Sequence, residues 1–299
     1  MNKALPIPIL IFILGLLLMG CSKKSTEIDW VYPDGNHKAL IMSYDDGLDD
    51  DIVLAQLFDR YGIIGTFHLN SGLLDTRAIW YQGKPNEFVG TYLSKDTLVH
   101  VFKNHEIAVH GTYHKALVGL SDEEILEEIN VDIENLSILS DRKISSMAYA
   151  FGSTNDHVAE VIGTTPLTNA RTVKPSYNFE LPKDYYLWNP TCHDSEALEY
   201  LEAYISLDSP SLSLFYVWGH SWELRDTLRN QNILKFCKKI GDRDDIWYTG
   251  AGDFADYHAS LKVLEIGPQQ IVNPEGNGIV YYREKGQLKS LNPGQRLIY

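Results

Sequence analysis

Short apolar runs alternate with stretches of helical periodicity along most of the chain. Runs rich in β-branched and aromatic residues predict strands, and apolar positions three and four residues apart predict helices. The predicted strands are residues 40–44, 66–69, 106–109, 146–151, 171–173, 185–188, 213–218 and 246–249. The predicted helices are residues 50–61, 95–104, 156–162, 224–240 and a long amphipathic helix that begins at Ser121. This alternation predicts a parallel α/β fold, either a barrel or an open sheet, with functional residues at the carboxyl ends of the strands.

Two segments interrupt the alternation. Residues 74–94 form a long predicted loop that holds Trp80, Tyr81 and Tyr92 among its aromatic residues. Long loops of this kind inside a compact domain are often binding elements. Beyond residue 257, short apolar runs are split by Gly and Pro, which predicts a small β-rich appendage over residues 258–299.

The first twenty residues have the pattern of an export signal. Lys3 precedes an apolar stretch over residues 5–19, and the stretch ends in Leu-Leu-Met-Gly before Cys21. This arrangement resembles a bacterial lipoprotein signal over residues 1–20, with Cys21 as the lipidated first residue of the mature chain. The alternative is a plain transmembrane anchor, but the stretch is short for a full span. Polar residues follow, and we predict a tether over residues 21–37 of an exported, membrane-anchored lipoprotein.

Charge and cysteine content narrow the possible partners. The net charge of -14 becomes -15 once residues 1–20, whose only charged residue is Lys3, are removed. So acidic a body lacks the basic patch that nucleic acid requires, and nothing in the sequence indicates a protein partner. Cys192 and Cys237 are either a disulfide or two free thiols, and no C-x-x-C spacing suggests a thiolate metal site.

Candidate chemistry lies where two predicted strands end. Asp45 and Asp46 follow the first predicted strand directly, and two adjacent carboxylates repel each other unless a cation or a proton lies between them. His110 and His114 follow the strand at 106–109, four residues apart, so that both imidazoles would face the same way on a helical turn. One carboxylate and two such histidines form a metal triad with room for water.

These motifs resemble those of the polysaccharide deacetylases, the NodB-like carbohydrate esterases of family 4. The run Ser43-Tyr-Asp-Asp-Gly47 is similar to the family's Thr-Phe-Asp-Asp-Gly motif, and His110-Gly-Thr-Tyr-His114 is similar to its His-Ser/Thr-x-x-His motif. The flanking runs at 65–70 and 104–109 agree as well. The resemblance covers residues 38–257, which we predict to be one catalytic domain, and it implies a distorted (β/α) barrel.

The resemblance also implies a hydrolytic site. By analogy, Asp46, His110 and His114 would bind a divalent metal, commonly zinc, with cobalt, nickel or iron as alternatives. Asp45 would be the general base that accepts a proton from water. The implied substrate is an acetylated carbohydrate. Its acetyl group would be N- or O-linked, and the sequence names no particular glycan.

Two further positions of the implied site follow from the resemblance. Phe151 lies where the family uses a backbone N–H to hold the developing oxyanion, and His220 matches the late histidine that protonates the leaving group. We also expect the substrate to contact side chains near the strand ends: Tyr44, Trp188, His193 and Trp222.

The third family motif is incomplete in this chain. The family has Arg-x-Pro-Tyr/Phe, whereas residues 148–151 read Ala-Tyr-Ala-Phe and lack the arginine that pairs with the catalytic base. We hypothesise that Arg171, on the next predicted strand, supplies the missing cation. The fourth motif, an Asp and a Trp that orient the late histidine, is blurred around Trp188.

Three other functions compete with the deacetylase interpretation. Residues 219–223 superficially resemble the nucleophile elbow of a serine esterase, but Glu223 stands where a glycine is needed. Two histidines and one carboxylate also form the triad of non-haem iron oxygenases, although paired aspartates argue against that class. The most serious competitor is a glycan-binding lipoprotein that has kept the fold and the metal but has lost turnover with the motif arginine.

Overall fold

The computed structural model of the chain describes residues 28–298. The predicted signal peptide and the predicted lipidation site Cys21 lie outside the described residues. Within the described range, no helix combines the length and the apolar character that a membrane span requires.

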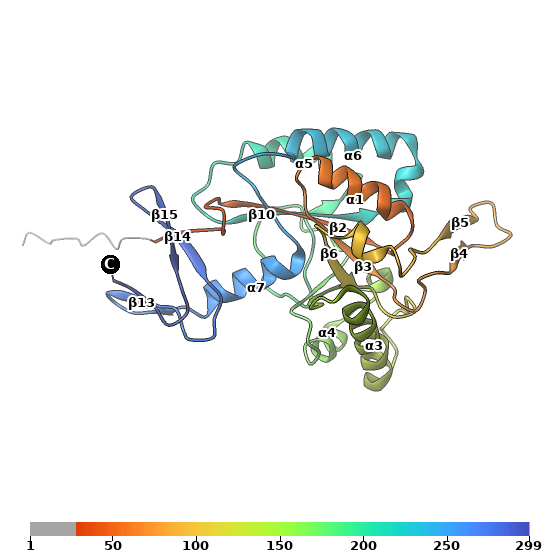
Figure 1. Ribbon diagram of the computed structural model, residues 1–299, viewed down its shortest axis with the longest axis horizontal. Helices are drawn as coiled ribbons and strands as arrows, with labels where there is room; N and C mark the ends of the chain where they lie inside the picture. Colours follow the sequence, from red (N-terminus) through yellow and green to blue (C-terminus); the bar gives the residue numbers. More distant parts are fainter. Residues whose placement is uncertain (1–27, 299) are drawn as a thin grey trace, which may run out of the picture.

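A curled sheet of parallel strands forms the centre of the molecule (Figure 1). Its path runs β8-β7-β6-β3-β2-β10-β9, and the short β11 pairs with the first half of β2. The strands are β2 (Lys38–Asp45), β3 (Gly65–Leu69), β6 (Glu106–Val109), β7 (Ser146–Ala148), β8 (Asn169–Arg171), β9 (Cys192–His193), β10 (Ser213–His220) and β11 (Trp247–Tyr248). All pairings in this sheet are parallel, which confirms the distorted (β/α) barrel expected from the sequence.

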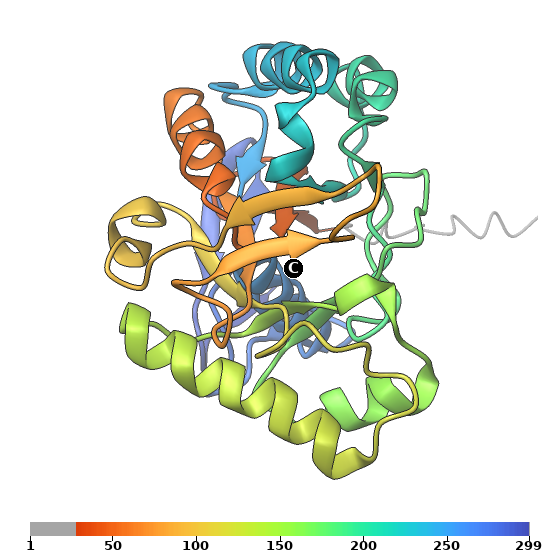
Figure 2. The same ribbon diagram turned by 90° about the vertical axis from the view of Figure 1, so that its right-hand side faces the viewer.

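Helices cover the sheet on two sides. Figure 2 shows α3 and α4 on one side and α1, α5 and α6 on the other. The helices are α1 (Asp50–Arg60), α2 (Leu98–Val101), α3 (Asp122–Ser140), α4 (Asp156–Ile162), α5 (Ala197–Ile205), α6 (Thr227–Ile240) and α7 (Ala251–Lys262), with 3-10 turns η1 (Ala150–Gly152) and η2 (Ser221–Arg225). Helix α3 begins with a capping box, in which the Ser121 and Glu124 side chains each accept from the other's backbone N–H. The strand β2 is buried from Ala39 onward, because helices pack on both of its faces.

Several predicted elements differ from the structure at their ends. The strand predicted at 146–151 ends at Ala148, because Phe151 has a left-handed φ of 58° inside η1. The strand predicted at 171–173 lies two residues earlier, as β8. Of the helix predicted at 95–104 only α2 forms. The helix predicted at 224–240 is divided into η2 and α6.

The strand predicted at 185–188 is wrong. The Asp184 carboxylate accepts hydrogen bonds from the backbone N–H groups of Tyr186 at 2.8 Å and Leu187 at 3.3 Å, and this local turn competes with an extended strand. Only an isolated bridge from Trp188 to Arg171 remains. The sheet takes its next strand from β9 instead, which contains Cys192. That residue and Cys237 are buried free thiols.

The long segment at 74–94 is not a plain loop. It contains an antiparallel hairpin of β4 (Arg77–Trp80) and β5 (Phe88–Thr91). Trp80 lies opposite Phe88, and their rings stack with centroids 4.4 Å apart, a cross-strand contact that stabilises the pairing. The hairpin projects from the sheet on the side away from the C-terminal strands (Figure 1).

The C-terminal segment forms two small antiparallel sheets. One contains β12 (Glu265–Ile266), β13 (Gln270–Val272) and β16 (Arg296–Ile298). The other contains β14 (Val280–Glu284) and β15 (Gln287–Leu291), and β1 (Asp29–Val31) pairs with β14. The sequence had not indicated β1, which lies within the segment predicted as a tether and joins the two ends of the described chain in one sheet.

Candidate active site

The carboxyl ends of four strands meet at one pocket of about 800 Å³. Asp45 ends β2, His110 follows β6, Arg171 ends β8 and His220 ends β10. Parallel strands place these ends at the same edge of the sheet, so residues far apart in the sequence become neighbours. Asp45, Asp46, His110, His114 and His220 all line the pocket.

The turn after β2 holds the two aspartates in unusual backbone conformations. Asp46 has a φ of 85° and Gly47 a φ of 71°, both in the left-handed region. A non-glycine residue in this region is strained, and such strain gathers at functional sites. A Cβ at Gly47 would lie 3.0 Å from the Leu69 side chain, so glycine is needed there for space as well as for conformation.

Asp46, His110 and His114 bring three metal-binding atoms together. The Asp46 Oδ1 lies 3.6 Å from His110 Nε2 and 3.4 Å from His114 Nε2. A tetrahedral site with bonds of about 2.0–2.1 Å requires ligand atoms about 3.3–3.4 Å apart. The three residues therefore fit a divalent metal such as zinc.

Groups around this triad hold its ligands in a binding-competent form. His110 Nδ1 donates to the Ala148 carbonyl at 2.9 Å, so its Nε2 faces Asp46 with a free lone pair. The Trp222 indole N–H donates to Asp46 Oδ2 at 2.8 Å and leaves Oδ1 for the metal. Burial lowers the pKa of both His110 and His114 to about 4, so both rings are neutral near pH 7.

Asp45 and Arg171 form a buried ion pair. One guanidinium nitrogen of Arg171 donates to both carboxylate oxygens of Asp45, and both side chains are almost completely buried. Burial alone would raise the pKa of the Asp45 carboxyl, but the Arg171 guanidinium lowers it well below its usual range. Asp45 is therefore an ionised carboxylate at the pocket wall, and the cation comes from β8, as hypothesised.

A hydrogen-bond network fixes the Arg171 side chain. Its Nε donates to Ser43 Oγ at 3.1 Å, and a second guanidinium nitrogen donates to the Thr172 carbonyl at 3.1 Å. The guanidinium also lies 4.7 Å from the ring centroid of Trp218, a cation–π contact. Ser43 Oγ in turn contacts His68 Nε2 at 2.9 Å. The position of the Asp45 carboxylate is therefore determined by neighbours on three strands.

His220 faces the aspartates from the end of β10. Burial alone would lower the pKa of His220, but the carboxylates of Glu223 and Asp46 raise it to about 9. Near pH 7 the ring is therefore protonated in this structure, the state that a proton donor requires. Phe151, also predicted for the site, lies at the pocket with its ring centroid 4.4 Å from that of His114.

Comparison with known proteins is consistent with this geometry. A family model described as polysaccharide deacetylase matches residues 33–170. The chain belongs to the polysaccharide deacetylase family. The match contains Asp45, Asp46, His110 and His114, which are the residues that suggested the resemblance. The comparison with curated proteins finds no match.

Solved structures show the same fold at low sequence identity. A Mycobacterium smegmatis protein assigned to the polysaccharide deacetylases is 14% identical, covers 77% of this chain and 93% of its own, and has a TM-score of 0.54. A CE4 family pseudoenzyme from Bacillus anthracis is 14% identical, with 74% and 66% covered and a TM-score of 0.45. A family 4 carbohydrate esterase from Streptomyces lividans, in complex with acetate, is 12% identical, with 68% and 89% covered and a TM-score of 0.43.

The expected substrate contacts of this polysaccharide deacetylase family member need correction. Trp222 lines the pocket. Tyr44 is fully buried and donates to Asp194 Oδ2 at 3.1 Å, and Trp188 packs in the core beside α7. Neither residue reaches the pocket, because each side chain points to the helix-covered face of its strand. His193 lies behind the pocket wall and contacts Glu223.

The sequence had not assigned several aromatic residues to the pocket. Those missed are Tyr113, Tyr149 and Trp218, whereas Trp80, Tyr81 and Tyr92 had been noted only as part of an aromatic loop. Tyr113 lies inside the histidine motif and Trp218 lies two residues before His220, so their proximity to ligand positions was the signal available. Such rings give the pocket of this deacetylase family member flat apolar faces that suit sugar rings.

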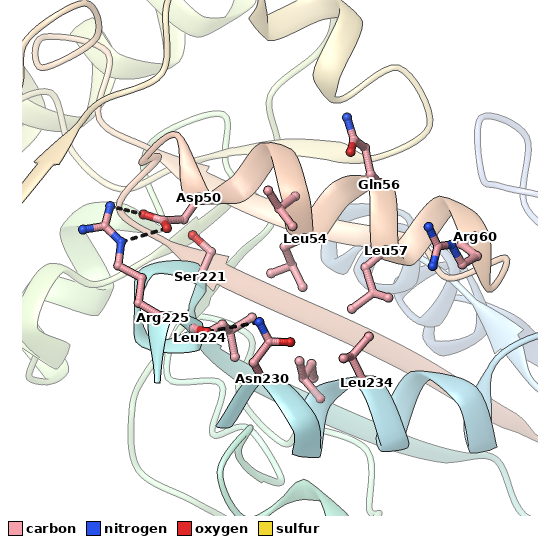
Figure 3. Close-up of a pocket in the computed structure, with 12 residues that line it drawn as sticks. Asp50, Leu54, Gln56, Leu57, Arg60, Ser221, Leu224, Arg225, Asn230 and Leu234 are labelled. Atoms are coloured by element: carbon pink, nitrogen blue, oxygen red, sulfur yellow. Dashed lines mark hydrogen bonds and ion pairs between the residues drawn. The ribbon is translucent and has the colours of Figure 1, made fainter. Parts of the chain in front are cut away.

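A second hollow of about 400 Å³ lies between α1 and α6 (Figure 3). At its mouth Arg225 donates to the Asp50 carboxylate through Nε at 2.9 Å and Nη2 at 2.6 Å. Leu54, Leu57 and other helical side chains form most of its wall, and none of the described residues lining it is a histidine or cysteine. The chemistry of this family member therefore belongs to the pocket at the strand ends.

Acid should destabilise the fold through His68. Burial lowers the pKa of His68 to about 3, so the folded state keeps this ring neutral while the unfolded state binds a proton below a pKa of about 6.5. The free energy of unfolding therefore falls as the pH drops from about 6.5 toward 3. Between pH 7 and pH 5 we expect wild type to lose about 2 kcal/mol more than His68→Gln does. Urea unfolding at both pH values measures this, and equal losses would contradict it.

Proposed function

We propose that this chain is a metal-dependent hydrolase that removes acetyl groups, N- or O-linked, from a carbohydrate. The observation that supports this most strongly is the placement of an ionised, arginine-held carboxylate beside a two-histidine, one-aspartate metal triad in a single pocket. Membership in the polysaccharide deacetylase family gives the class of substrate. The ligand set suits zinc, with cobalt, nickel or iron as alternatives.

Asp45 and Arg171 act together in this proposal. When bound by Asp46, His110 and His114, a divalent metal supplies Lewis acidity that makes water a better nucleophile and polarises a carbonyl. Asp45 accepts the proton from the attacking water as general base. Arg171 is a positioning residue, because it touches Asp45 and holds the carboxylate toward the pocket.

His220 and Phe151 complete the proposed chemistry. His220 is protonated and lines the same pocket, so it donates a proton to the departing amine or alcohol of the sugar. The Phe151 backbone N–H is our candidate for the oxyanion contact, since the left-handed φ at this residue brings the turn against His114. Trp222 and the neighbouring rings hold the sugar.

The competing interpretations lose their support. The glycan-binding alternative depended on the missing motif arginine, and Arg171 contacts Asp45 in its place. A serine esterase would need an accessible nucleophile, whereas Ser221 is buried. We further propose, from the sequence alone, that the protein is exported and anchored through a lipid on Cys21.

Acetate release from a panel of acetylated glycans tests the proposed function. The full-length protein, loaded with zinc, is incubated with N-acetylated and O-acetylated polysaccharides, with and without a chelator. We expect acetate from at least one class, its loss with chelator and its return with added zinc. Tight zinc binding without acetate from any glycan would favour the glycan-binding alternative.

A further inference from the structure

A second group of metal-binding atoms lies behind His220. His193 at the end of β9, His220 at the end of β10 and Glu223 in η2 have ligand atoms that all lie within 4.8 Å of one another. His193 Nε2 lies 3.1 Å from Glu223 Oε2, and His220 Nδ1 lies 3.4 Å from the same oxygen. These separations are close to the 3.4 and 3.6 Å found in the Asp46 triad.

The atoms of this second cluster are close without being hydrogen bonded. His220 Nδ1 and Glu223 Oε2 are buried and have no hydrogen-bond partner, so their short separation is not aligned for N–H donation. Buried polar atoms without a partner are rare and call for an explanation. A cation between the three ligand atoms would satisfy both atoms at once, because about 3.3 Å is the ligand separation of a tetrahedral site with bonds near 2.0 Å.

The outer atoms of the cluster are held in the arrangement that metal ligands need. His193 Nδ1 lies 2.9 Å from Ser195 Oγ and 3.1 Å from Asp194 Oδ1, so acceptors on that side favour the ring form with a free Nε2 lone pair. Arg229 Nη1 lies 2.8 Å from Glu223 Oε1 and leaves Oε2 to face the histidines. The nearby positive charge of Arg229 makes this site weaker than the first.

We propose that His193, His220 and Glu223 form a second, weaker binding site for a zinc-like divalent cation, and that its occupation inhibits the enzyme. A cation on His220 Nδ1 leaves the ring only the Nε2 proton, whose loss would create an imidazolate. The ring is then a far weaker acid than the protonated imidazolium. The binding claim stands on its own, whereas the inhibition claim rests on the proposed function.

Zinc titration of the full-length protein tests the binding claim without using activity. Equilibrium dialysis against increasing free zinc should give two zinc ions per chain for wild type, and one for His193→Ala and for the near-isosteric Glu223→Gln. His114→Ala should lose the tight ion and keep the weak one. His157→Ala is the matched control, because it removes an exposed histidine paired with Asp122 elsewhere on the surface, and it should still bind two. Saturation of wild type at one ion, or two ions in His193→Ala, would overturn the site.

Activity at high zinc tests the inhibition claim separately. When free zinc exceeds the dissociation constant of the weak site about tenfold, wild-type acetate release should fall about tenfold, as mass action requires. His193→Ala, compared with its own rate at low zinc, should not fall. Two bound ions without inhibition would refute the inhibition and leave the site. No acetate release at any zinc concentration would count against the proposed function and not against the site.

Discussion

Replacing Arg171 with alanine should lower acetate release by about 100-fold or more while zinc content stays at the wild-type level. Arg171 contacts Asp45 and none of the three proposed metal ligands, so its loss frees the base without removing the metal site. Displacing a catalytic group by about 1 Å can cost about 100-fold in rate. Acetate assay and metal analysis of the same sample measure both quantities.

The pH profile distinguishes a positioning role from a general loss of structure. Without the guanidinium, burial dominates and raises the pKa of Asp45, so the acidic limb of the activity profile should move to higher pH. Arg171→Lys keeps the charge but not the planar donor group, and should recover part of the rate. Folding is checked by thermal unfolding, since breaking a buried pair costs about 3–5 kcal/mol. A folded Arg171→Ala protein with near-normal turnover would exclude the proposed pairing role.

The second large effect is expected at His220. His220→Ala should slow release of an N-acetyl group by about 10²–10⁴-fold, which is the usual contribution of a positioned proton donor. An amine leaves poorly unless it is protonated, whereas an aryl acetate leaves as a stable phenolate. The same variant should therefore lose much less activity on an aryl acetate.

The ratio of the two rates is the informative quantity. Assays of wild type and His220→Ala on both substrates, at low zinc so that the second cluster stays empty, give this ratio directly. Trp222→Phe is a useful comparison, because it removes the hydrogen bond to Asp46 and should affect both substrates alike. Equal losses on both substrates for His220→Ala would show that His220 does not protonate the leaving group.

Local patterns predicted the framework of the site well. The apolar run before Asp45 predicted β2, and the run before His110 predicted β6, because buried parallel strands are continuous apolar stretches. Once both were known to be parallel strands, their carboxyl ends had to meet. The convergence of Asp46 with His110 and His114 therefore followed from short motifs and their order.

Other features depend on contacts between distant segments. The pairing of Arg171 with Asp45 was a hypothesis in the sequence, because only the register of β8 in the sheet decides which way that side chain points. Tyr44 and Trp188 were expected at the pocket but are buried, since one residue along a strand reverses the face. Glu223 was considered only as a residue that disrupts a nucleophile elbow, and its contacts with two histidines appear only in the folded chain.

The most direct test of the account compares acetate release by wild type and Asp45→Asn on one glycan that the panel identifies as a substrate. Asparagine keeps the shape of Asp45 and its contact with Arg171 but cannot accept the proton from water. We predict that Asp45→Asn binds as much zinc as wild type and releases no measurable acetate. Turnover near the wild-type rate at equal zinc content would contradict Asp45 as the base and, with it, the central claim for this pocket.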